Sequence, residues 1–240
     1  PRAGSVLTIP LQTILPDAPR EGIVINLAEL RLYYYPPGKN EVTVYPIGIG
    51  QLGGDTLTPT MVTTVSDKRA NPTWTPTANI RARYKAQGID LPAVVPAGPD
   101  NPMGHHAIRL AAYGGVYLLH GTNADFGIGM RVSSGCIRLR DDDIKTLFNV
   151  VTPGTKVNII NTPIKVSEEP GGVRLVEIPQ PLSKNIGDDP QTLPINLNAA
   201  MVSFKTNANT NSEVMERAME ARSGMPTDVT RHHDVIQQSM

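Results

Sequence analysis

The single cysteine of the chain, Cys136, is the side chain best suited to covalent chemistry. It lies in the segment Ser133-Ser134-Gly135-Cys136-Ile137-Arg138-Leu139, where a glycine and two serines leave the sulfur approachable. A tight turn with successive backbone N–H groups facing outward polarises a carbonyl for attack, and a nearby helix N-terminus or cation favours the thiolate. An unpaired cysteine is more often a buried apolar residue, so it is the turn that indicates a nucleophile.

A thiol nucleophile needs a base, and His120 is the best candidate. It ends an apolar strand and begins Gly121-Thr122-Asn123, a corner where a polar ring should face a cleft. A glycine-rich loop separates it from Cys136, 16 residues later, and such a loop can bring two strand ends together. An isolated histidine is more often structural, and the same holds for His105 and His106. The remaining histidines, 232 and 233, fall in an expected frayed tail.

Short strands and turns must position these residues, because the chain holds 21 glycines and 22 prolines. Two runs of β-branched and aromatic residues are split by Ala28-Glu29 and predict a hairpin. An extended pattern follows as far as Gly50, and two more strands flank the Cys136 segment. The expected strands lie at residues 23–27, 30–35, 42–49, 115–120 and 156–160.

Helices are expected to be few and short. Residues 78–87 predict a helix closed by Gly88, within a long irregular stretch that begins after Gly50. Residues 92–104 carry four prolines and predict a structured loop that shapes a surface site. The helix that starts at residue 141 opens with three aspartates, which suit the positive end of the helix dipole and receive no catalytic role.

The texture of the sequence changes after Pro163. A short strand at residues 174–178 lies among prolines and asparagines, and residues 212–222 predict a helix with one apolar face. The sequence therefore predicts a mostly β core over roughly residues 22–162, followed by a small appended domain.

The composition excludes several functions. The 22 basic and 22 acidic residues cancel, so the net charge suggests neither nucleic acid nor an anionic membrane as a partner. No stretch has the length of a transmembrane helix. One cysteine allows neither an internal disulfide nor a multi-cysteine metal site, and we expect no metal and no cofactor. The first residues do not resemble a signal peptide and are expected to lie within a longer protein.

The His120 and Cys136 segments together resemble the signature of the YkuD-type L,D-transpeptidases, a His-Gly element followed by Ser/Thr-His-Gly-Cys. The resemblance covers essentially the whole chain. Within the family it is to the enterobacterial group of ErfK, YbiS, YcfS and YnhG, and most to the YnhG-like members. The further segments that carry it are residues 71–76, 95–104, 124–129 and 222–226.

The resemblance implies a fold and domain boundaries. The fold is mainly β, with an L,D-transpeptidase β-sandwich catalytic domain that has few short helices and a small α+β C-terminal domain. Residues 1–15 would be the end of a glycan-binding LysM module and a linker. Residues 22–162 would form the catalytic domain, and residues 163–240 the C-terminal domain with a flexible tail.

The resemblance also implies a reaction on peptidoglycan stem peptides in the periplasm. The Cys136 thiolate attacks the carbonyl of meso-diaminopimelate in a donor tetrapeptide. His120 accepts the thiol proton and later protonates the departing D-alanine. The backbone carbonyl of Gly121 orients His120, and backbone N–H groups around Ser134 and Gly135 hold the oxyanion. An amine then resolves the thioester.

One position departs from the family pattern, because the histidine before Gly135 is here Ser134. The general base of the family is the upstream histidine, so His120 keeps that role. Ser134 removes a supporting group near the thiol, which affects fine tuning rather than the mechanism.

Other side chains are candidates for binding the substrate. Arg138 could bind a donor carboxylate through a bidentate guanidinium, or could be a helix-entry arginine paired with Asp141 or Asp142. Trp74 could form a stacking wall, although tryptophan more often serves packing. The full set of expected substrate-binding residues is Arg138, Ser133, Asn123 and Trp74.

Several functions fit this chemistry. The first, favoured by the YnhG-like resemblance, is formation of 3-3 cross-links between meso-diaminopimelate residues. The second is attachment of an outer-membrane lipoprotein lysine to the same acyl-enzyme. A third is a non-catalytic peptidoglycan-binding protein, for which Ser134 is the hint. A hydrolytic Cys/His peptidase is a fourth, since transfer exceeds hydrolysis only where water is excluded.

Overall fold

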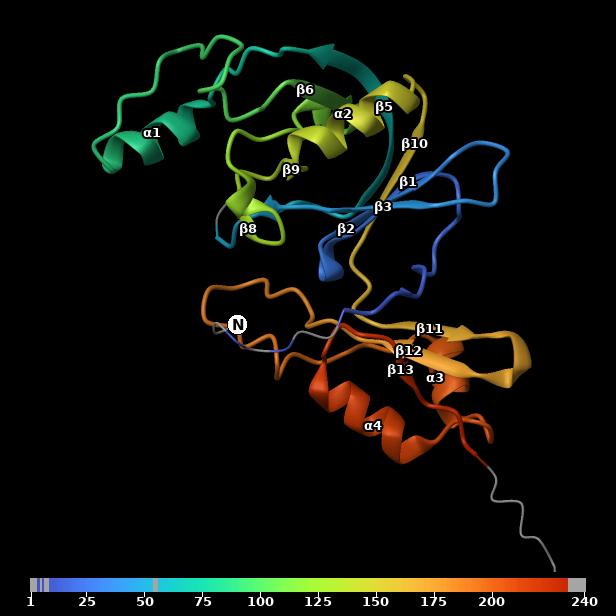
Figure 1. Cartoon of the computed structure of the whole chain (residues 1–240). Coiled ribbons are helices and arrows are strands. Elements are labelled where there is room, and N and C mark those ends of the chain that lie inside the picture. The colour runs from blue at the N-terminus through green and yellow to red at the C-terminus, as the bar shows by residue number, and fades with distance from the viewer. Residues whose placement is uncertain (1–3, 5, 7–8, 54–55, 233–240) are drawn as a thin grey trace, which may run out of the picture. The chain divides into compact units, whose positions relative to one another are not determined.

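The computed structural model (Figure 1) describes residues 4, 6, 9–53 and 56–232. The chain forms two compact units. The larger unit comprises Ala18–Asn161 and Lys184–Gly187, and the smaller unit comprises Pro1–Asp17, Thr162–Ser183 and Asp188–Met240. The expected mainly β character of the chain is confirmed, since the described residues form thirteen strands and only four short α-helices.

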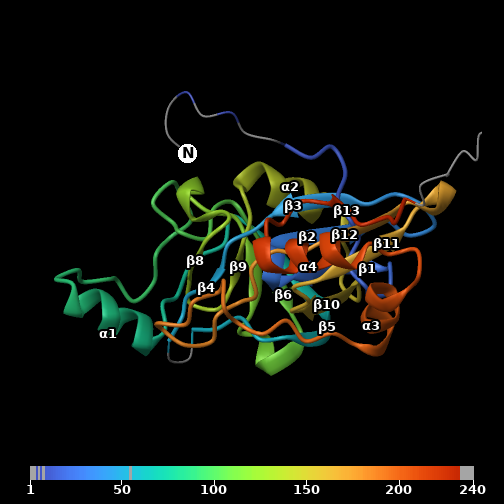
Figure 2. The same cartoon turned by 90° about the horizontal axis from the view of Figure 1, so that it is seen from below.

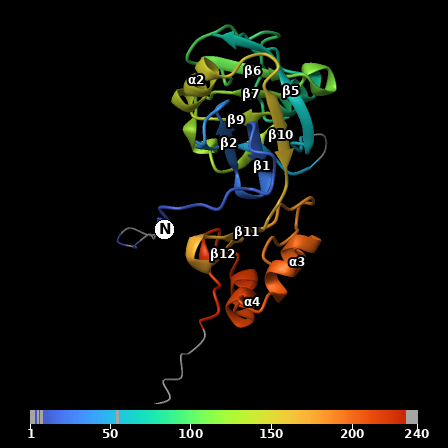
Figure 3. The ribbon, with the colours of Figure 1, turned by 90° about the vertical axis from the view of Figure 1, so that its right-hand side faces the viewer.

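The larger unit is built on a sheet of eight strands within the described residues. The strand order is β3-β2-β1-β10-β5-β6-β7-β9. The predicted hairpin is confirmed, because β1 pairs with β2 antiparallel, and β1 also lies beside β10 in parallel (Figure 3). The strands are β1 (Gly22–Asn26), β2 (Arg31–Tyr35), β3 (Thr43–Pro46), β5 (Met61–Ala70), β6 (His106–Leu110), β7 (Leu118–His120), β9 (Ile137–Arg138) and β10 (Lys156–Ile160). A second, parallel pair joins β4 (Ile49–Gly50) to β8 (Arg131–Ser133).

Strand β5 joins the two halves of this sheet. Its first residues pair with β10 and its later residues pair with β6, and the register shifts between Val65 and Asp67. The prediction of an irregular stretch after Gly50 was wrong here. Only Val65 of the strand is buried, and Val62 is largely exposed, so the strand lacks the alternating apolar pattern that marks a half-buried strand in a sequence.

Helix α2 (Asp141–Val150) packs its buried Ile144 and Leu147 toward strands β6 and β7. Lys68 of β5 closes the C-terminal end of the helix by donating hydrogen bonds to the carbonyls of Phe148 (2.5 Å) and Val151 (2.7 Å). A cation at this position complements the helix dipole and satisfies carbonyls that have no partner within the helix. The helix expected from residue 141 is therefore present. It packs against β6 and against β7, the strand that carries His120.

The strand expected at residues 115–120 is shorter than predicted. It begins only at Leu118, because residues Ala112–Gly115 form the 3-10 turn η2. Tyr113, Gly114 and Gly115 have positive φ angles there, which strand geometry excludes.

Helix α1 (Ala78–Ala86) lies on the long segment between β5 and β6, away from the sheet strands in two views (Figures 1 and 2). Thr77 caps it by accepting a hydrogen bond from the Ile80 N–H, and Gly88 follows it with a φ of +79°. The helix is as predicted, yet it buries none of its residues. Its position therefore depends on the loops beside it.

The loop at residues 92–104 is structured, as predicted. Trp74 and Val95 exchange two backbone hydrogen bonds of 2.9 and 2.7 Å. The fully buried Asn101 donates to the Pro72 and Pro96 carbonyls at 2.9 and 3.0 Å and accepts from the Met103 N–H. The Asn101 side chain thus satisfies backbone groups of Pro72, which precedes α1 in the sequence, and of Pro96 and Met103, which follow it.

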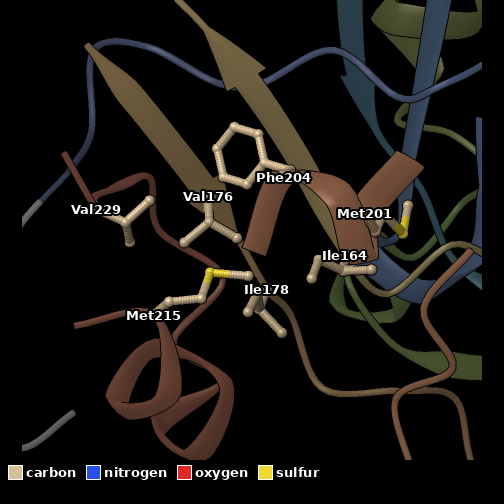
Figure 4. Close-up of a cluster of buried hydrophobic side chains, with 7 residues drawn as sticks. All are labelled: Ile164, Val176, Ile178, Met201, Phe204, Met215 and Val229. Carbon is tan, nitrogen blue, oxygen red and sulfur yellow. The ribbon is translucent and has the colours of Figure 1, made fainter. Parts of the chain in front are cut away.

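The smaller unit is α+β. Strands β11 (Lys165–Glu168), β12 (Arg174–Glu177) and β13 (Thr227–Asp228) form its sheet, and helices α3 (Ala199–Thr206) and α4 (Ser212–Ala221) complete it. Helix α4 was predicted and α3 was not, because α3 is only eight residues long and its apolar face buries only Met201 and Phe204. The core of this unit (Figure 4) consists of Ile164, Val176, Ile178, Met201, Phe204, Met215 and Val229.

A buried ion pair lies at the N-terminal edge of this unit. Lys165 Nζ is 3.1 Å from Glu177 Oε1, and both side chains are at most 1% exposed. Lys165 also donates to the Ile14 carbonyl (2.7 Å), and Glu177 accepts from the Ile14 N–H and the Thr13 hydroxyl (both 2.9 Å). These contacts tie residues 13 and 14 to β11 and β12.

Residues 1–15 were expected to end a LysM module, and no strand is found in the part of them that the structure describes. Leu7 and Thr8 lie outside the described residues, and Val6, Ile9 and Pro10 belong to no strand. The tail expected after His232 also lies outside them.

Replacing Glu177 with Gln should destabilise the smaller unit, since it removes the carboxylate 3.1 Å from the buried Lys165 ammonium. We expect a loss of about 3 kcal/mol in the free energy of unfolding. Urea unfolding followed by far-UV circular dichroism measures it. The exposed pair Lys156–Glu21, 2.7 Å apart, is the control, and Glu21→Gln should cost about 0.5 kcal/mol or less. Equal losses in the two variants would contradict a special role for the buried pair.

Candidate active site

A cleft of about 730 Å³ lies in the larger unit, and Cys136 and His120 both line it. The sheet supplies one side of the cleft through β7 and β9. Helix α1 and the Trp74 segment supply the other side through Trp74, Ile80, Arg83 and Tyr84. Polar and apolar residues both line the cleft around a single thiol, so it can offer hydrogen bonds as well as apolar contacts to a ligand.

The parallel pairing of β7 and β9 brings the two chemical groups together. Leu119 lies opposite Ile137, and His120 lies opposite Arg138. Cys136 immediately precedes β9, so the thiol and the imidazole come from adjoining strands. Three backbone hydrogen bonds extend this frame. The Leu139 N–H donates to the His120 carbonyl (2.9 Å), and Arg138 and Gly48 exchange two bonds of 2.8 Å.

The turn before Cys136 is held by side chains that satisfy its backbone. Gly135 has a φ of +107°, which a residue with a Cβ rarely adopts. The Ser133 hydroxyl donates to the Cys136 carbonyl (2.5 Å) and accepts from the Gly135 N–H (3.2 Å). The Gly135 N–H, one of the expected oxyanion donors, is therefore already engaged.

Thr58 and Gly50 support this turn from behind. The Thr58 hydroxyl donates to the Gly135 carbonyl (2.8 Å) and accepts from the Gly50 N–H (2.9 Å). A Cβ on Gly50 would lie 2.0 Å from the Thr56 carbonyl oxygen and 3.1 Å from the Gly135 Cα, so only glycine fits there. Neither Thr58 nor Gly50 was predicted, because their roles depend on contacts 77 or more residues away along the chain.

His120 is 5% exposed, and its ring is oriented by its own backbone neighbour. Its Nδ1 is 2.6 Å from the Gly121 carbonyl oxygen. The carbonyl can only accept, so Nδ1 carries the proton and Nε2 keeps its lone pair. Burial lowers the pKa of His120 to about 4, although the bond to Gly121 opposes this effect. The imidazole is therefore neutral at neutral pH and able to accept a proton.

Burial also acts on the thiol and raises the pKa of Cys136. A hydrogen bond from the Leu118 backbone and the charges of Arg138 and Arg109 oppose this effect without cancelling it. The sulfur lies 3.8 Å from the Val116 carbonyl oxygen, which suits a protonated thiol as a weak donor. Cys136 and His120 are thus both neutral in the free protein.

The expected substrate-binding residues fall into two groups. Arg138 and Trp74 line the cleft, and so does Ser133, whose hydroxyl is occupied by the turn. Asn123 is exposed and does not line the cleft, because its amide donates to the Pro99 carbonyl (3.2 Å) and holds the loop at residues 92–104.

Arg138 does not pair with Asp141 or Asp142, which was the alternative reading of this residue. Asp141 instead accepts from the His105 N–H (2.9 Å), and its other oxygen is 2.5 Å from His105 Nδ1. Arg138 Nε is buried, and no described residue accepts a hydrogen bond from it. Its guanidinium therefore faces the cleft with donor capacity to spare.

Ser134, which replaces the motif histidine, has a partner that the sequence did not reveal. Arg83 of α1 donates from Nη2 to the Ser134 hydroxyl at 2.6 Å. Arg83 and Ser134 are 51 residues apart, and nothing in the sequence of α1 distinguishes Arg83 from its other basic residues.

Neither a metal site nor a membrane span is found in the part of the chain that the structure describes. No group of three or more His, Cys, Asp or Glu side chains is placed to hold a metal ion there. No helix among the same residues is long and apolar enough to cross a membrane.

Two known domain families match this chain. Residues 20–159 match the L,D-transpeptidase catalytic domain YkuD, and residues 163–229 match the L,D-transpeptidase C-terminal domain. The first match contains both His120 and Cys136.

Three relatives from Escherichia coli K12 extend over almost the whole chain. The probable L,D-transpeptidase YcfS is 87% identical, and the alignment covers 97% of this chain and 72% of YcfS. ErfK/SrfK is 50% identical over 96% of this chain and 74% of its own length. YbiS is 52% identical over 94% and 73%, respectively. These relatives do not support the expectation of closest resemblance to YnhG-like members, because the high identity is to YcfS.

Solved structures of L,D-transpeptidases are more distant. An L,D-transpeptidase of Enterococcus faecium has a TM-score of 0.42 and 22% identity, covering 59% of this chain and 50% of the other. One from Mycobacterium smegmatis has a TM-score of 0.42 and 21% identity, covering 58% of each chain. The two domain matches, and the three relatives that align with almost the whole chain, show the family without these structures. This chain belongs to the L,D-transpeptidase family.

Proposed function

We propose that the protein is a peptidoglycan L,D-transpeptidase with Cys136 as nucleophile and His120 as general base and acid. The donor is a tetrapeptide stem, and the bond cleaved joins meso-diaminopimelate to the terminal D-alanine. The observation that carries this proposal is the placement of two groups in one cleft: His120 at the end of β7, with Nδ1 bonded to Gly121, and Cys136 directly before the adjoining parallel strand β9.

The reaction has two balanced halves. In the first, the Cys136 sulfur forms a bond to the diaminopimelate carbonyl carbon while its proton moves to Nε2 of His120. The tetrahedral intermediate then expels D-alanine, whose amine receives that proton, and a thioester remains. In the second half an acceptor amine attacks the thioester, His120 takes a proton from that amine, and the departing sulfur is protonated again.

The backbone N–H groups of Ser134 and Gly135 are the proposed oxyanion donors. In the free protein the Ser133 hydroxyl occupies the Gly135 N–H, so the substrate oxygen must displace it. The 3.2 Å length of that bond makes the exchange inexpensive compared with the 2.5 Å bond from the same hydroxyl to Cys136. The turn can therefore keep its shape while one donor is released.

The neutral resting pair fits a transferase that must not react with water. A permanent thiolate–imidazolium pair would need stabilising charges, and burial disfavours both ions here. Proton transfer then accompanies attack on a bound carbonyl. Arg138 and Trp74 are the proposed contacts of the donor, through a carboxylate and through a side wall, respectively.

The acceptor amine belongs to one of two classes. Meso-diaminopimelate of a second stem gives 3-3 cross-links, and the lysine of an outer-membrane lipoprotein gives a covalent anchor. The resemblance to YnhG-like members was the reason to prefer the first, and the identity to YcfS removes that preference. Both amines are therefore kept as acceptors of the same thioester.

The substrate also implies a location and an arrangement of domains. We infer that the protein acts in the periplasm, where stem peptides lie. The proposed boundaries are residues 22–162 for the catalytic domain and 163–240 for the C-terminal domain. An upstream LysM module that ends within residues 1–15 is a further proposal. Ile14, near the end of residues 1–15, forms hydrogen bonds through its backbone with Lys165 and Glu177. Ile14 therefore belongs to the C-terminal domain and not to the proposed module.

Mass spectrometry of the products tests the nucleophile. With a disaccharide-tetrapeptide as substrate, the wild-type protein should form a thioester on Cys136 with loss of D-alanine, and Cys136→Ala should form none. His120→Gln should slow thioester formation by about 10²-fold or more. A wild-type protein as inactive as Cys136→Ala would rule out the enzyme and leave a peptidoglycan-binding protein. Free tripeptide as the main product would indicate a hydrolase.

The acceptor is tested by offering both amines at equal concentration. One reaction contains a second tetrapeptide stem, and the other contains a peptide with the C-terminal lysine of an outer-membrane lipoprotein. A dimer lacking one D-alanine identifies the cross-linking activity, and an isopeptide-linked adduct identifies lipoprotein attachment. Formation of neither product, while the thioester accumulates, would show that the true acceptor is another amine.

Alkylation by iodoacetamide tests the neutral resting pair. The rate at Cys136 should rise about tenfold per pH unit between about pH 6 and 9, because a thiol with a raised pKa gains thiolate at that rate. Urea-unfolded protein is the control and should react faster at pH 7, since its thiol has its ordinary pKa. A rate that is already constant from acidic pH upward would reveal a thiolate–imidazolium pair.

A further inference from the structure

The cleft around Cys136 is strongly cationic. Its lining includes four guanidinium groups, those of Arg69, Arg83, Arg109 and Arg138, and a single carboxylate, that of Asp67. The chain as a whole has equal numbers of basic and acidic residues, so this excess of positive charge is local. It favours an anionic ligand in the cleft.

The four guanidinium groups differ in how they are already used. Arg69 Nε forms an ion pair with Asp67 (3.1 Å). Arg109 donates to the Gly115 carbonyl (2.6 Å), and its Cδ would lie 3.0 Å from a Cβ on Gly115. Arg138 is the contact already proposed for the donor. Arg83 remains, and it approaches the Cys136 turn from the opposite wall of the cleft.

Arg83 has an uncompensated charge beside the nucleophile. Its Nη2 donates to the neutral Ser134 hydroxyl (2.6 Å), two residues before Cys136. No acidic side chain within the described residues forms an ion pair with it. A guanidinium has five N–H donors, and a hydroxyl satisfies one of them. A carboxylate is the stronger partner because a bidentate ion pair adds charge to two parallel hydrogen bonds.

Helix α1 can present this side chain without disturbing the core. None of its residues is buried, so its position is not fixed by core packing. Arg83 is half-buried, whereas Arg81 on the same helix is exposed and does not line the cleft. The two arginines therefore form a natural pair of test residue and control.

We propose that Arg83 is a specificity-determining residue that binds a carboxylate of the donor stem peptide beside Cys136, exchanging the Ser134 hydroxyl for that carboxylate. The inference rests on the proposed function, because it takes the donor to be a tetrapeptide stem. Such a donor carries two carboxylates near the scissile bond, one on the diaminopimelate side chain and one on the terminal D-alanine. The Arg83 guanidinium can bind either one, because both are carboxylates.

The test compares three donors and three proteins. The donors are the free disaccharide-tetrapeptide, the same donor with the diaminopimelate side-chain carboxylate as an amide, and the same donor with the D-alanine carboxylate as an amide. The proteins are wild type, Arg83→Gln and the control Arg81→Gln. Thioester formation is followed by mass spectrometry, and kcat and KM are obtained separately, with circular dichroism to verify folding.

In the wild type, amidation of the carboxylate that Arg83 binds should raise KM roughly tenfold. Arg83→Gln should raise KM for the free donor by the same factor, and amidation of that carboxylate should then have no further effect. The carboxylate that Arg83 binds is the one whose amidation raises KM in the wild type and has no effect in Arg83→Gln. kcat should change less than twofold, because the contact is made equally in the bound donor and in the transition state. Arg81→Gln should behave as the wild type.

Additive effects of Arg83→Gln and of both amidations would overturn the proposal, and so would an unchanged KM in Arg83→Gln. Failure of the proposed function gives a different result, since the wild type would then form no thioester with the free donor. A purely structural role of Arg83 would lower kcat with all three donors alike, which also contradicts the proposal.

Discussion

The parallel pairing of β7 with β9 is the constraint on which the rest of the site depends. Parallel strands cannot be joined by a tight turn, so a connection must run from the end of β7 to the start of β9. In this chain the connection is the segment between His120 and Cys136, and its two ends are the chemical groups themselves. Sheet hydrogen bonds therefore fix His120 and the residue after Cys136, and the Ser133 and Thr58 hydroxyls hold the turn that carries Cys136 itself.

Around that pairing, the protein uses burial to set protonation. His120 is nearly inaccessible, and its proton stays on Nδ1 because Gly121 accepts it at 2.6 Å. Cys136 is kept as a thiol by the same low-polarity surroundings, with Arg109 and Arg138 at a distance that moderates the effect. Burial therefore disfavours the charged form of both groups in the free protein.

The sequence was sufficient to find the residues with local signals. The Cys136 turn, the His-Gly corner and the β1–β2 hairpin each show within a few residues the pattern that they form in the structure. Helix α1 was found for the same reason, because Gly88 marks its end. These features depend on backbone preferences that neighbours in the chain determine.

What the sequence did not reveal depends on contacts between distant segments. Strand β5 has one buried side chain, so its pairing with two other strands leaves no apolar period to recognise. Thr58 supports Gly135 from 77 residues away, and Arg83 reaches Ser134 from 51. Asn123 was assigned to the substrate from its place in a motif, whereas its amide holds Pro99. Spacing in a sequence shows which residues are near one another only where the intervening fold is already known.

The attachment of Ile14 to Glu177 has a consequence for synthesis on the ribosome. All eight strands of the main sheet lie between residues 22 and 160, so this sheet can form once that stretch has emerged. The smaller unit is discontinuous: Ile14 must wait for β11 and β12, and its core closes only when Val229 arrives. A nascent chain can therefore assemble the sheet that holds His120 and Cys136 while residues 13 and 14 still lack their partners. The order of translation thus separates formation of the sheet beside Cys136 from completion of the smaller unit, which contains residues 13 and 14.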